Sequence, residues 1–354
     1  PPPPPPPSPM TPLTHHQIRP LRPNPSQIPF SSPPPPFATS LRTLRPQEKP
    51  YTLPKPSSVL VRAAKSDPTH LLSAEQNKPP PFPASDDDGI PVDYVKTLAR
   101  FKSRYNYIRV LEVSRRADHQ FAGSRLLLLD APGNIHSVSF LLKPLTNTYF
   151  DVFATFPPVL PPGPIGILGF GAGSAARLIF HLYPHVEIHG WELDPSVISV
   201  GREYFGLAKL EKQNPDRLFV HIGDALQAEV GGGGFSGILV DLFSKGSLIP
   251  ELQDPTTWQK LKRGLRRGGR IMVNCGGSCV ESEDPGRDGK LVMEETLRAM
   301  KEVFHQELFV LNLGHRREDS TLALTGSSPD FDAWRQVLPP PLTCYVDMWA
   351  PFDG

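Results

Sequence analysis

One stretch, residues 165–194, limits what this chain can fold into more than any other. An apolar run at 165–168, typical of a buried parallel strand, leads into a glycine-rich turn and then into a helical pattern. A second strand, over 186–191, ends at Glu192. The sequence therefore predicts a β-turn-α-β unit that presents backbone N–H groups to a ligand and a carboxylate to a ribose diol.

The glycine turn leaves three interpretations open. Residues 171–176 match the dinucleotide fingerprint G-x-G-x-x-A, with an acidic residue about 20 positions further on. The same unit also suits an adenosyl thioether such as S-adenosylmethionine. The third interpretation is a tight turn in an α/β protein that binds no ligand. The acidic end of the second strand argues against this third interpretation, and so do the motifs further along the chain.

Acidic residues follow successive predicted strands of the central region. Strands alternate with helical patterns, which predicts a doubly wound, mostly parallel sheet. The strands expected after the first two are 218–222, 238–240, 270–274, 308–313 and 320–324. Glu192, Asp224 and Asp241 all fall at carboxyl ends of strands, where such sheets bind ligands. Three acids beside a glycine turn indicate a ligand site.

A small antiparallel β-region is predicted before this central unit. Alternating patterns over 105–113, 125–129 and 135–142 predict its strands. A turn at 130–134 contains proline and glycine and joins the last two strands. Residues 146–156 are expected to form a short helix that leads into the central domain.

The N-terminal part of the chain has a different composition. Residues 1–63 are rich in proline, serine and basic residues and contain one acid, Glu48. No apolar run there is long enough for a secretory core or a membrane span. This profile is typical of an organelle transit peptide, and residues 61–64 (Val-Arg-Ala-Ala) resemble the cleavage motif of chloroplast transit peptides. The expected location is the chloroplast stroma, and a disordered proline-rich tail with another use is the alternative.

These patterns predict five parts. They are a disordered proline-rich transit peptide (1–63), a linker (64–91), an N-terminal β-hairpin region (92–145), a Rossmann-like domain (146–340) and a C-terminal tail (341–354).

Charge and cysteine content exclude several functions. The formal net charge is +1, so no nucleic-acid or membrane surface is expected. The basic cluster at 260–270 is interpreted as the solvated face and last turn of one helix. Cys275, Cys279 and Cys344 lack the spacing of a metal site, so we expect no metal and a reducing compartment.

The order of the motifs resembles the spermidine/spermine synthase family. The motifs are the glycine turn, Glu192-x-Asp194, Gly223-Asp224-Ala225 and Val240-Asp241. Residues 103–110 are similar to an N-terminal strand of that family, with Asn106 where the family usually has Gln. The resemblance implies a Rossmann-like methyltransferase fold with a small N-terminal antiparallel β-region. It also implies S-adenosylmethionine, or its decarboxylated form, in the groove.

The resemblance assigns residues to a cofactor side of the groove. They are Gly169, Gly171, Gly173, Glu192, Asp224, Ala225 and Asn106. The glycine loop would back the thioether tail, and Glu192, at the groove rim, would accept hydrogen bonds from both ribose hydroxyls. Asp224 would bond the adenine amino group, and Ala225 would contribute its backbone.

The acceptor side follows from the same resemblance. Asp241 would face the reacting centre and take a proton from an attacking amine, which makes it the candidate catalytic residue. Tyr149 and Asp151 fall where the family has Tyr-Gln-Glu, and Phe150 replaces the Gln.

Departures from the family pattern favour a divergent, spermidine synthase-like branch. Ala172 stands where the family has an Asp that holds the aminopropyl amine, and Ser244 replaces a second carboxylate. A polyamine site needs carboxylates to replace water, and this sequence has lost several of them. An Asp at position 172 would be expected to shift preference towards the decarboxylated donor.

The leading interpretation is therefore an S-adenosylmethionine-binding transferase that methylates a small-molecule or unidentified acceptor. Aminopropyl transfer in polyamine biosynthesis is the first alternative. A catalytically silent nucleotide-binding or scaffold protein is the second, and a dehydrogenase is the weakest. No nucleic acid or membrane partner is expected, and a homodimer is left open.

Overall fold

The computed structural model describes residues 90–278, 280–314 and 320–354. All of these residues belong to one unit of the chain, 57–354. The predictions for the transit peptide and for the linker up to residue 89, and the side chain of Cys279, lie outside the described residues.

The N-terminal β-region is a four-stranded antiparallel sheet in the order β1-β2-β3-β4. Its strands are β1 (Val95–Lys102), β2 (Tyr107–Val113), β3 (Ser124–Leu128) and β4 (Ile135–Phe140). Strand β1 was not predicted, because most of its side chains are exposed or half-buried and a bulge between Thr97 and Ala99 breaks the alternation. The other three strands form where the alternating patterns predict them.

The central sheet has eight strands in the order β14-β12-β13-β11-β8-β5-β6-β7. Its strands are β5 (Ile165–Leu168), β6 (Ile188–Glu192), β7 (Leu218–Ile222), β8 (Phe235–Val240), β11 (Leu265–Asn274), β12 (Leu308–Asn312), β13 (Thr321–Thr325) and β14 (Ala350–Pro351). The five neighbouring strands β11, β8, β5, β6 and β7 run parallel to one another. Strand β13 runs antiparallel to both β11 and β12. The predicted Rossmann-like methyltransferase fold with a mostly parallel sheet is confirmed.

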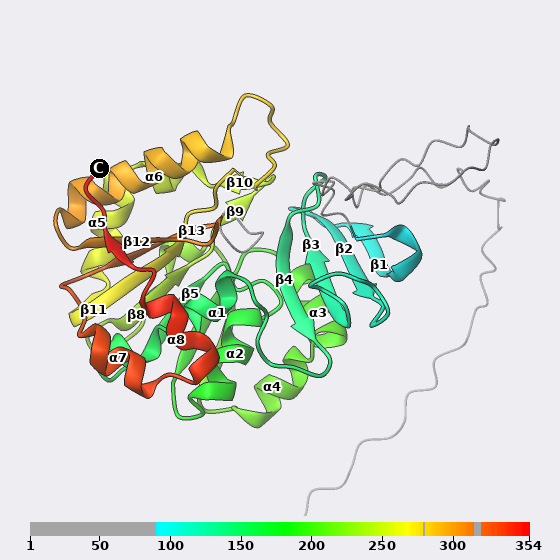
Figure 1. The fold of residues 1–354 in the computed structure, drawn as a ribbon, viewed down its shortest axis with the longest axis horizontal. Helices are drawn as coiled ribbons and strands as arrows, with labels where there is room; N and C mark the ends of the chain where they lie inside the picture. Colours follow the sequence, from blue (N-terminus) through cyan, green and yellow to red (C-terminus); the bar gives the residue numbers. More distant parts are fainter. Residues whose placement is uncertain (1–89, 279, 315–319) are drawn as a thin grey trace, which may run out of the picture. The chain divides into compact units, whose positions relative to one another are not determined.

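Helices cover both faces of this sheet (Figure 1). They are α1 (Tyr149–Phe153), α2 (Ser174–Leu182), α3 (Pro195–Tyr204), α4 (Leu207–Gln213), α5 (Pro255–Arg263), α6 (Gly289–Phe304), α7 (Phe331–Val337) and α8 (Pro340–Val346). Figure 1 shows α5 and α6 on one side of the sheet and α1, α2, α7 and α8 on the other. A short hairpin of β9 (Phe243–Ser244) and β10 (Ser247–Leu248) follows β8.

The central strands separate two hydrophobic cores, because successive side chains of a strand point to opposite faces. Ile167 and Leu239 pack into the core beneath α1, α2, α7 and α8. Their neighbours Leu168 and Val240 pack into the core beneath α5 and α6. Burial on both faces explains why these strands are continuous apolar runs in the sequence.

Acidic and hydroxyl side chains fix where several helices begin. Asp194 accepts a hydrogen bond from the backbone N–H of Ser196 at the start of α3, as its position before a proline predicts. Asp254 does the same for α5, and Thr148 caps α1.

The expectation of a separate C-terminal tail at 341–354 is wrong. Most of α8 lies in this segment, and β14 pairs with β12 at the edge of the central sheet. Tyr345 and Trp349 are buried in the core next to Trp334. The helix could not be predicted from the sequence because it begins within a run of prolines and has only seven residues, which is too short for a clear hydrophobic periodicity.

Candidate active site at the carboxyl end of the central sheet

The order of the central strands reverses at β5, whose neighbours are β6 on one side and β8 on the other. In doubly wound sheets this reversal opens a crevice at the carboxyl ends of the strands. The glycine loop follows β5, Glu192 ends β6, and Asp241 directly follows β8. Three predicted site segments therefore meet at the place where this fold binds ligands.

The glycine loop adopts backbone angles that favour glycine. Gly169, Gly171 and Gly173 have φ values of +86°, +56° and +82°. A Cβ atom at Gly169 would lie 2.1 Å from the carbonyl oxygen of Asp241, and one at Gly171 would lie 2.7 Å from Oγ of Ser137. These glycines are required because β8 and β4 approach the loop so closely.

The N–H groups of the loop are bonded within the protein. Gly171 donates to Oε2 of Glu192 at 3.0 Å, and Ala172 donates to Oγ of Ser137 at 2.9 Å. Gly173 donates to the carbonyl oxygen of Phe170 at 3.0 Å. The loop is thus closed on itself, on β6 and on β4, and these N–H groups are already bonded rather than available to a phosphate.

Strand β4 is also fastened to the start of α2. The hydroxyl of Ser174 donates to the carbonyl oxygen of Val138 at 2.9 Å and accepts from its N–H at 3.0 Å. Together with Ser137, this bond lays β4 against the glycine loop. The N-terminal sheet therefore forms one wall of the crevice.

Glu192 is more deeply placed than the expected groove rim, with an exposed fraction of 9%. Oε2 accepts from Gly171, and Oε1 accepts from the N–H of Asp194 at 3.0 Å. Burial raises the pKa of this carboxyl, while the two backbone hydrogen bonds and the charge of His136 act in the opposite direction. A carboxylate offers about four acceptor positions, so each oxygen retains one for a further donor.

Asp224 and Ala225 lie at the end of the next strand, β7. Asp224 is exposed, and its Oδ1 accepts from the N–H of Leu226 at 2.9 Å, which caps the 3-10 helix η3 (Ala225–Gln227). Ala225 is buried in the core beneath α5. Asp224 keeps acceptor capacity on the outer side of this turn.

Asp241 is held by two side chains from distant segments. Tyr149 of α1 donates its hydroxyl to Oδ2 at 2.8 Å, and Asn274, the last residue of β11, donates to Oδ1 at 3.0 Å. Burial raises the pKa of Asp241 to about 6, although both hydrogen bonds and the charge of His136 favour the ionised form. A carboxyl with a pKa near neutrality is suited to accept a proton. Asn274 was not singled out in the sequence.

Asn106 contacts the loop after β6. Its side-chain amide donates to Oδ2 of Asp194 at 2.8 Å, and the hydroxyl of Ser103 donates to the same oxygen. Asn106 therefore joins the turn between β1 and β2 to the start of α3, two residues after Glu192.

The prediction that Asp151 lies on the acceptor side of the groove is corrected by the structure. Its carboxylate is 1% exposed and accepts from the N–H and hydroxyl of Thr146 and from the N–H of Asn147. These bonds shape the loop before α1. Tyr149 and Asp151 are two positions apart on one helical turn, so their side chains point in different directions.

The expectation for Ala172 also needs correction. Its side chain is fully buried in an apolar cluster with Ile108, Val197 and Phe205. A Cβ at Gly201 of α3 would lie 3.5 Å from the Cβ of Ala172, so that side chain faces α3. An Asp at 172 would enter this cluster, and the expected shift in donor preference does not follow.

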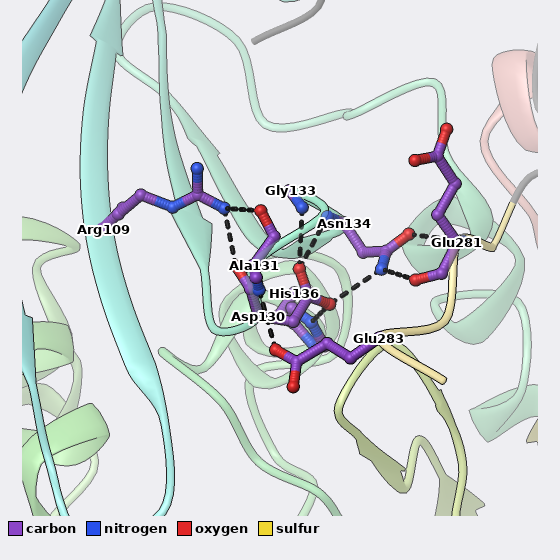
Figure 2. Close-up of polar contacts among 8 residues, drawn as sticks. All are labelled: Arg109, Asp130, Ala131, Gly133, Asn134, His136, Glu281 and Glu283. Carbon is purple, nitrogen blue, oxygen red and sulfur yellow. Dashed lines mark hydrogen bonds and ion pairs between the residues drawn. The ribbon is translucent and has the colours of Figure 1, made fainter. Parts of the chain in front are cut away.

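A second polar group, missed in the sequence, lies at the turn between β3 and β4 (Figure 2). Asp130 is 2% exposed, and its Oδ2 lies 3.0 Å from Nε2 of His136. Its Oδ1 accepts from the N–H groups of Gly133 and Asn134. Burial acts to raise the pKa of Asp130, but the hydrogen bonds from His136 and Asn134 and the charge of His136 outweigh it and lower the pKa overall.

Two neighbouring segments support this turn. Arg109 of β2 donates through Nη2 to the carbonyl oxygens of Asp130 and Ala131, at 2.6 and 3.2 Å (Figure 2). From the loop between β11 and α6, Oε1 of Glu283 accepts from the N–H of Ala131 at 2.9 Å. The sequence did contain a signal for this contact: an Asp and a His stand six positions apart around a proline–glycine turn. Such a turn pairs β3 with β4 and brings the two side chains together.

A cavity of about 250 Å³ lies along α2, away from these groups. The loop between β4 and α1 and the side chains of Arg177, Leu178 and His181 line it. Glu192, Asp224 and Asp241 do not line this cavity. It shares Val138 and Ser174 with the wall of the crevice but contains none of the three acids.

Two further properties apply to the described part of the chain. Within 90–278, 280–314 and 320–354, no group of three or more His, Cys, Asp or Glu side chains is arranged to hold a metal ion. Over the same residues, the helices are too short or too polar for any of them to cross a bilayer.

No family model matches this chain. Curated proteins are similar over part of it. A probable polyamine aminopropyl transferase of Bifidobacterium longum is 30% identical over 105 residues, which are 29% of this chain and 22% of that protein. The eEF1A lysine and N-terminal methyltransferase of Homo sapiens is 29% identical over 121 residues, which are 30% of this chain and 17% of that protein.

The chain resembles spermidine synthase-like proteins of the S-adenosylmethionine-dependent transferase superfamily. The similarity to these two proteins confirms the resemblance predicted from the motifs, and both are transferases by name. The matches span about a fifth of the length of the curated relatives.

Solved structures with a similar arrangement include a spermidine synthase from Thermotoga maritima and human methyltransferase-like protein 13 in complex with SAH. The first has a TM-score of 0.49 at 15% identity and covers 69% of this chain and 76% of that chain. The second has a TM-score of 0.39 at 22% identity and covers 56% of this chain and 85% of that chain.

Proposed function

We propose that this chain binds S-adenosylmethionine at the crevice beside β5 and transfers its methyl group to an acceptor. The observation that carries the proposal is the state of the glycine loop. The N–H groups of Gly171, Ala172 and Gly173 already have partners within the protein. A pyrophosphate is held by such N–H groups, so a dinucleotide is disfavoured, whereas an adenosyl thioether has no phosphate to bind.

The residues present fit an adenosyl group. Glu192 has one acceptor position left on each oxygen, which matches the two hydroxyls of a ribose. Asp224, exposed after β7, is available to accept from an exocyclic amino group. The same two roles are those that the resemblance assigns to these residues.

The position of Asp241 favours a methyl-transfer reaction over ligand binding without catalysis. When bound, S-adenosylmethionine supplies an electrophilic methyl group. Asp241 would take the proton that a neutral nucleophile gives up as its bond to carbon forms. Tyr149 and Asn274 orient the carboxylate, and a pKa of about 6 leaves it able to accept a proton near neutral pH. A silent scaffold has no need for a partly buried, oriented carboxylate of this kind.

Aminopropyl transfer to a polyamine is the second candidate. The similarity to a probable polyamine aminopropyl transferase favours it. Glu283, in the loop that packs on the turn between β3 and β4, places a carboxylate near the wall of the crevice. The residues Ala172 and Ser244 argue against aminopropyl transfer, because they stand where the family has carboxylates that would hold a cationic tail.

Calorimetric titration of the full chain tests the proposal. We expect S-adenosylmethionine and methylthioadenosine to bind and NAD to give no signal. If neither adenosyl compound binds, the proposal is rejected and a scaffold role gains support. A parallel incubation with decarboxylated S-adenosylmethionine and putrescine decides between the two candidates, because formation of spermidine would show aminopropyl transfer.

A further inference from the structure

His136 lies at the crevice, on the strand that covers the glycine loop. Its carbonyl oxygen would be 3.3 Å from a Cβ placed on Gly171. Its ring meets the ring of Phe243, two residues after Asp241, edge-on with 6.5 Å between centroids. The backbone of His136 therefore lies beside the loop after β5, and its imidazole packs against the segment after β8.

One nitrogen of the His136 ring is hydrogen-bonded within the protein, and the other has no hydrogen-bond partner among the described residues. Nε2 faces Oδ2 of Asp130 at 3.0 Å, and because Asp130 is ionised, Nε2 is the donor. Within the described residues, Nδ1 has no hydrogen-bond partner. The side chain retains 15% exposure. A second partner for this ring must come from outside these residues.

The charges around His136 indicate what that partner is. The charge of His136 reaches both Glu192 and Asp241, since it acts on the pKa of each. Two other cationic side chains lie near this segment, and the buried Nε of one of them, Arg109, has no hydrogen-bond partner among the described residues. Nη2 of Arg109 is held by two carbonyl oxygens, and Lys245 is exposed on the turn between β9 and β10. The neighbouring acids are Asp130, which holds the ring, and Glu281 and Glu283 at the adjoining loop.

We propose that His136, oriented by Asp130, binds the α-carboxylate of the methionine tail and thereby selects S-adenosylmethionine over its decarboxylated form. This inference rests on the proposed function, in which the glycine loop beneath His136 backs that tail. A carboxylate placed between Glu192 and Asp241 would be repelled unless a cation accompanied it. An imidazolium at position 136, with Nε2 donating to Asp130 and Nδ1 donating to the ligand carboxylate, would supply that cation, and Asp130 is a positioning residue that fixes which nitrogen faces the ligand.

The test pairs one change in the protein with one change in the ligand. Wild type and His136→Gln are titrated with S-adenosylmethionine, its decarboxylated form and methylthioadenosine. Gln keeps a hydrogen-bond donor and loses the charge. We expect His136→Gln to weaken S-adenosylmethionine binding by about tenfold, the scale of one charge-assisted hydrogen bond, and to change the other two affinities less than about twofold.

Two further variants complete the design. Asp130→Asn should reduce the preference for the carboxylate in the same direction as His136→Gln, while binding of methylthioadenosine is retained. His181→Gln, an exposed histidine on α2, should change no affinity. Thermal unfolding of each variant shows that the comparison is made on folded protein.

The outcomes separate this inference from the proposed function. Equal losses for all three ligands, or no loss for S-adenosylmethionine, would overturn the assignment of the carboxylate to His136. A wild type that binds methylthioadenosine but prefers the decarboxylated donor overturns the inference and leaves the adenosyl site standing. A wild type that binds none of the three rejects both.

Discussion

The hydroxyl of Tyr149 donates a 2.8 Å hydrogen bond to Oδ2 of Asp241, although the two residues are 92 positions apart in the chain. Asn274 donates to the other oxygen, so both acceptor atoms of the carboxylate are oriented. Burial nevertheless raises the pKa of Asp241 to about 6. At neutral pH the ionised carboxylate therefore opposes folding, which is a common property of functional acids.

Asp241→Asn should stabilise the protein at pH 8 and give little gain at pH 4. The folded-state pKa of about 6 exceeds the unfolded value of about 3.9, so the folded state holds the proton more tightly. Wild-type stability therefore falls as pH rises from about 4 to about 6 and then levels off, and the variant lacks this fall. Urea unfolding across this range should show a difference of about 1–3 kcal/mol at pH 8. Parallel pH profiles for the two proteins would contradict the assignment.

Glu192→Ala should affect both ligand binding and stability. Loss of two hydrogen bonds to ribose hydroxyls should weaken methylthioadenosine binding on the order of 100-fold. The N–H groups of Gly171 and Asp194 also lose their acceptor, so the free energy of unfolding should fall by about 1–3 kcal/mol. Glu187→Ala, at the exposed residue before β6, is the control; it should leave the affinity unchanged and, because Glu187 pairs with His189, lower the free energy of unfolding by less than about 1 kcal/mol. Unchanged affinity in folded Glu192→Ala would remove this residue from the ligand site.

Ala172→Asp should destabilise the fold rather than change donor preference. The new carboxylate would enter the apolar cluster that contains Ile108, Val197 and Phe205, and the nearby guanidinium of Arg177 already donates to the carbonyl oxygens of residues 172 and 205. A buried, unpaired charge should lower the free energy of unfolding by about 3 kcal/mol or more. Ala208→Asp, on the exposed face of α4, adds the same group in water and should be nearly neutral. A stable Ala172→Asp protein that prefers the decarboxylated donor would show that this side chain does reach the crevice.

Gly171→Ala should be more harmful than Gly206→Ala. Both residues have positive φ, +56° and +72°, so both variants carry a similar backbone strain. At Gly206 the new Cβ meets nothing within 4 Å, whereas at Gly171 it lies 2.7 Å from Oγ of Ser137. We expect Gly171→Ala to lose about 1–3 kcal/mol more stability in urea unfolding, because β4 must move off the loop. Equal losses would mean that the contact between β4 and the loop is soft.

The N-terminal segment is predicted to direct import into chloroplasts. A fluorescent protein fused to residues 1–70 should enter plastids and lose the segment near residue 63, because the composition and the motif at 61–64 resemble those of a transit peptide. A fusion that carries residues 64–70 alone is the control and should stay in the cytosol. Cytosolic fluorescence from the longer fusion would reject the targeting prediction.

The sequence by itself determined the central architecture. Apolar runs such as 165–168 and 238–240 predict strands buried on both faces, and the glycine turn predicts a close approach of the backbone. These are local signals, since period and turn chemistry are written in neighbouring residues. For the same reason the positions of Glu192, Asp224 and Asp241 at strand ends followed from the sequence.

Only the tertiary structure decided which side chains meet. The contacts of Tyr149 and Asn274 with Asp241 join segments that are far apart in the chain, and no local pattern encodes such pairings. It also decided that Ala172 faces α3, because a single residue in a tight turn can point either way until its neighbours pack. The tertiary structure also decided that residues 350–351 form strand β14, because so short a strand is stabilised only by its pairing with β12.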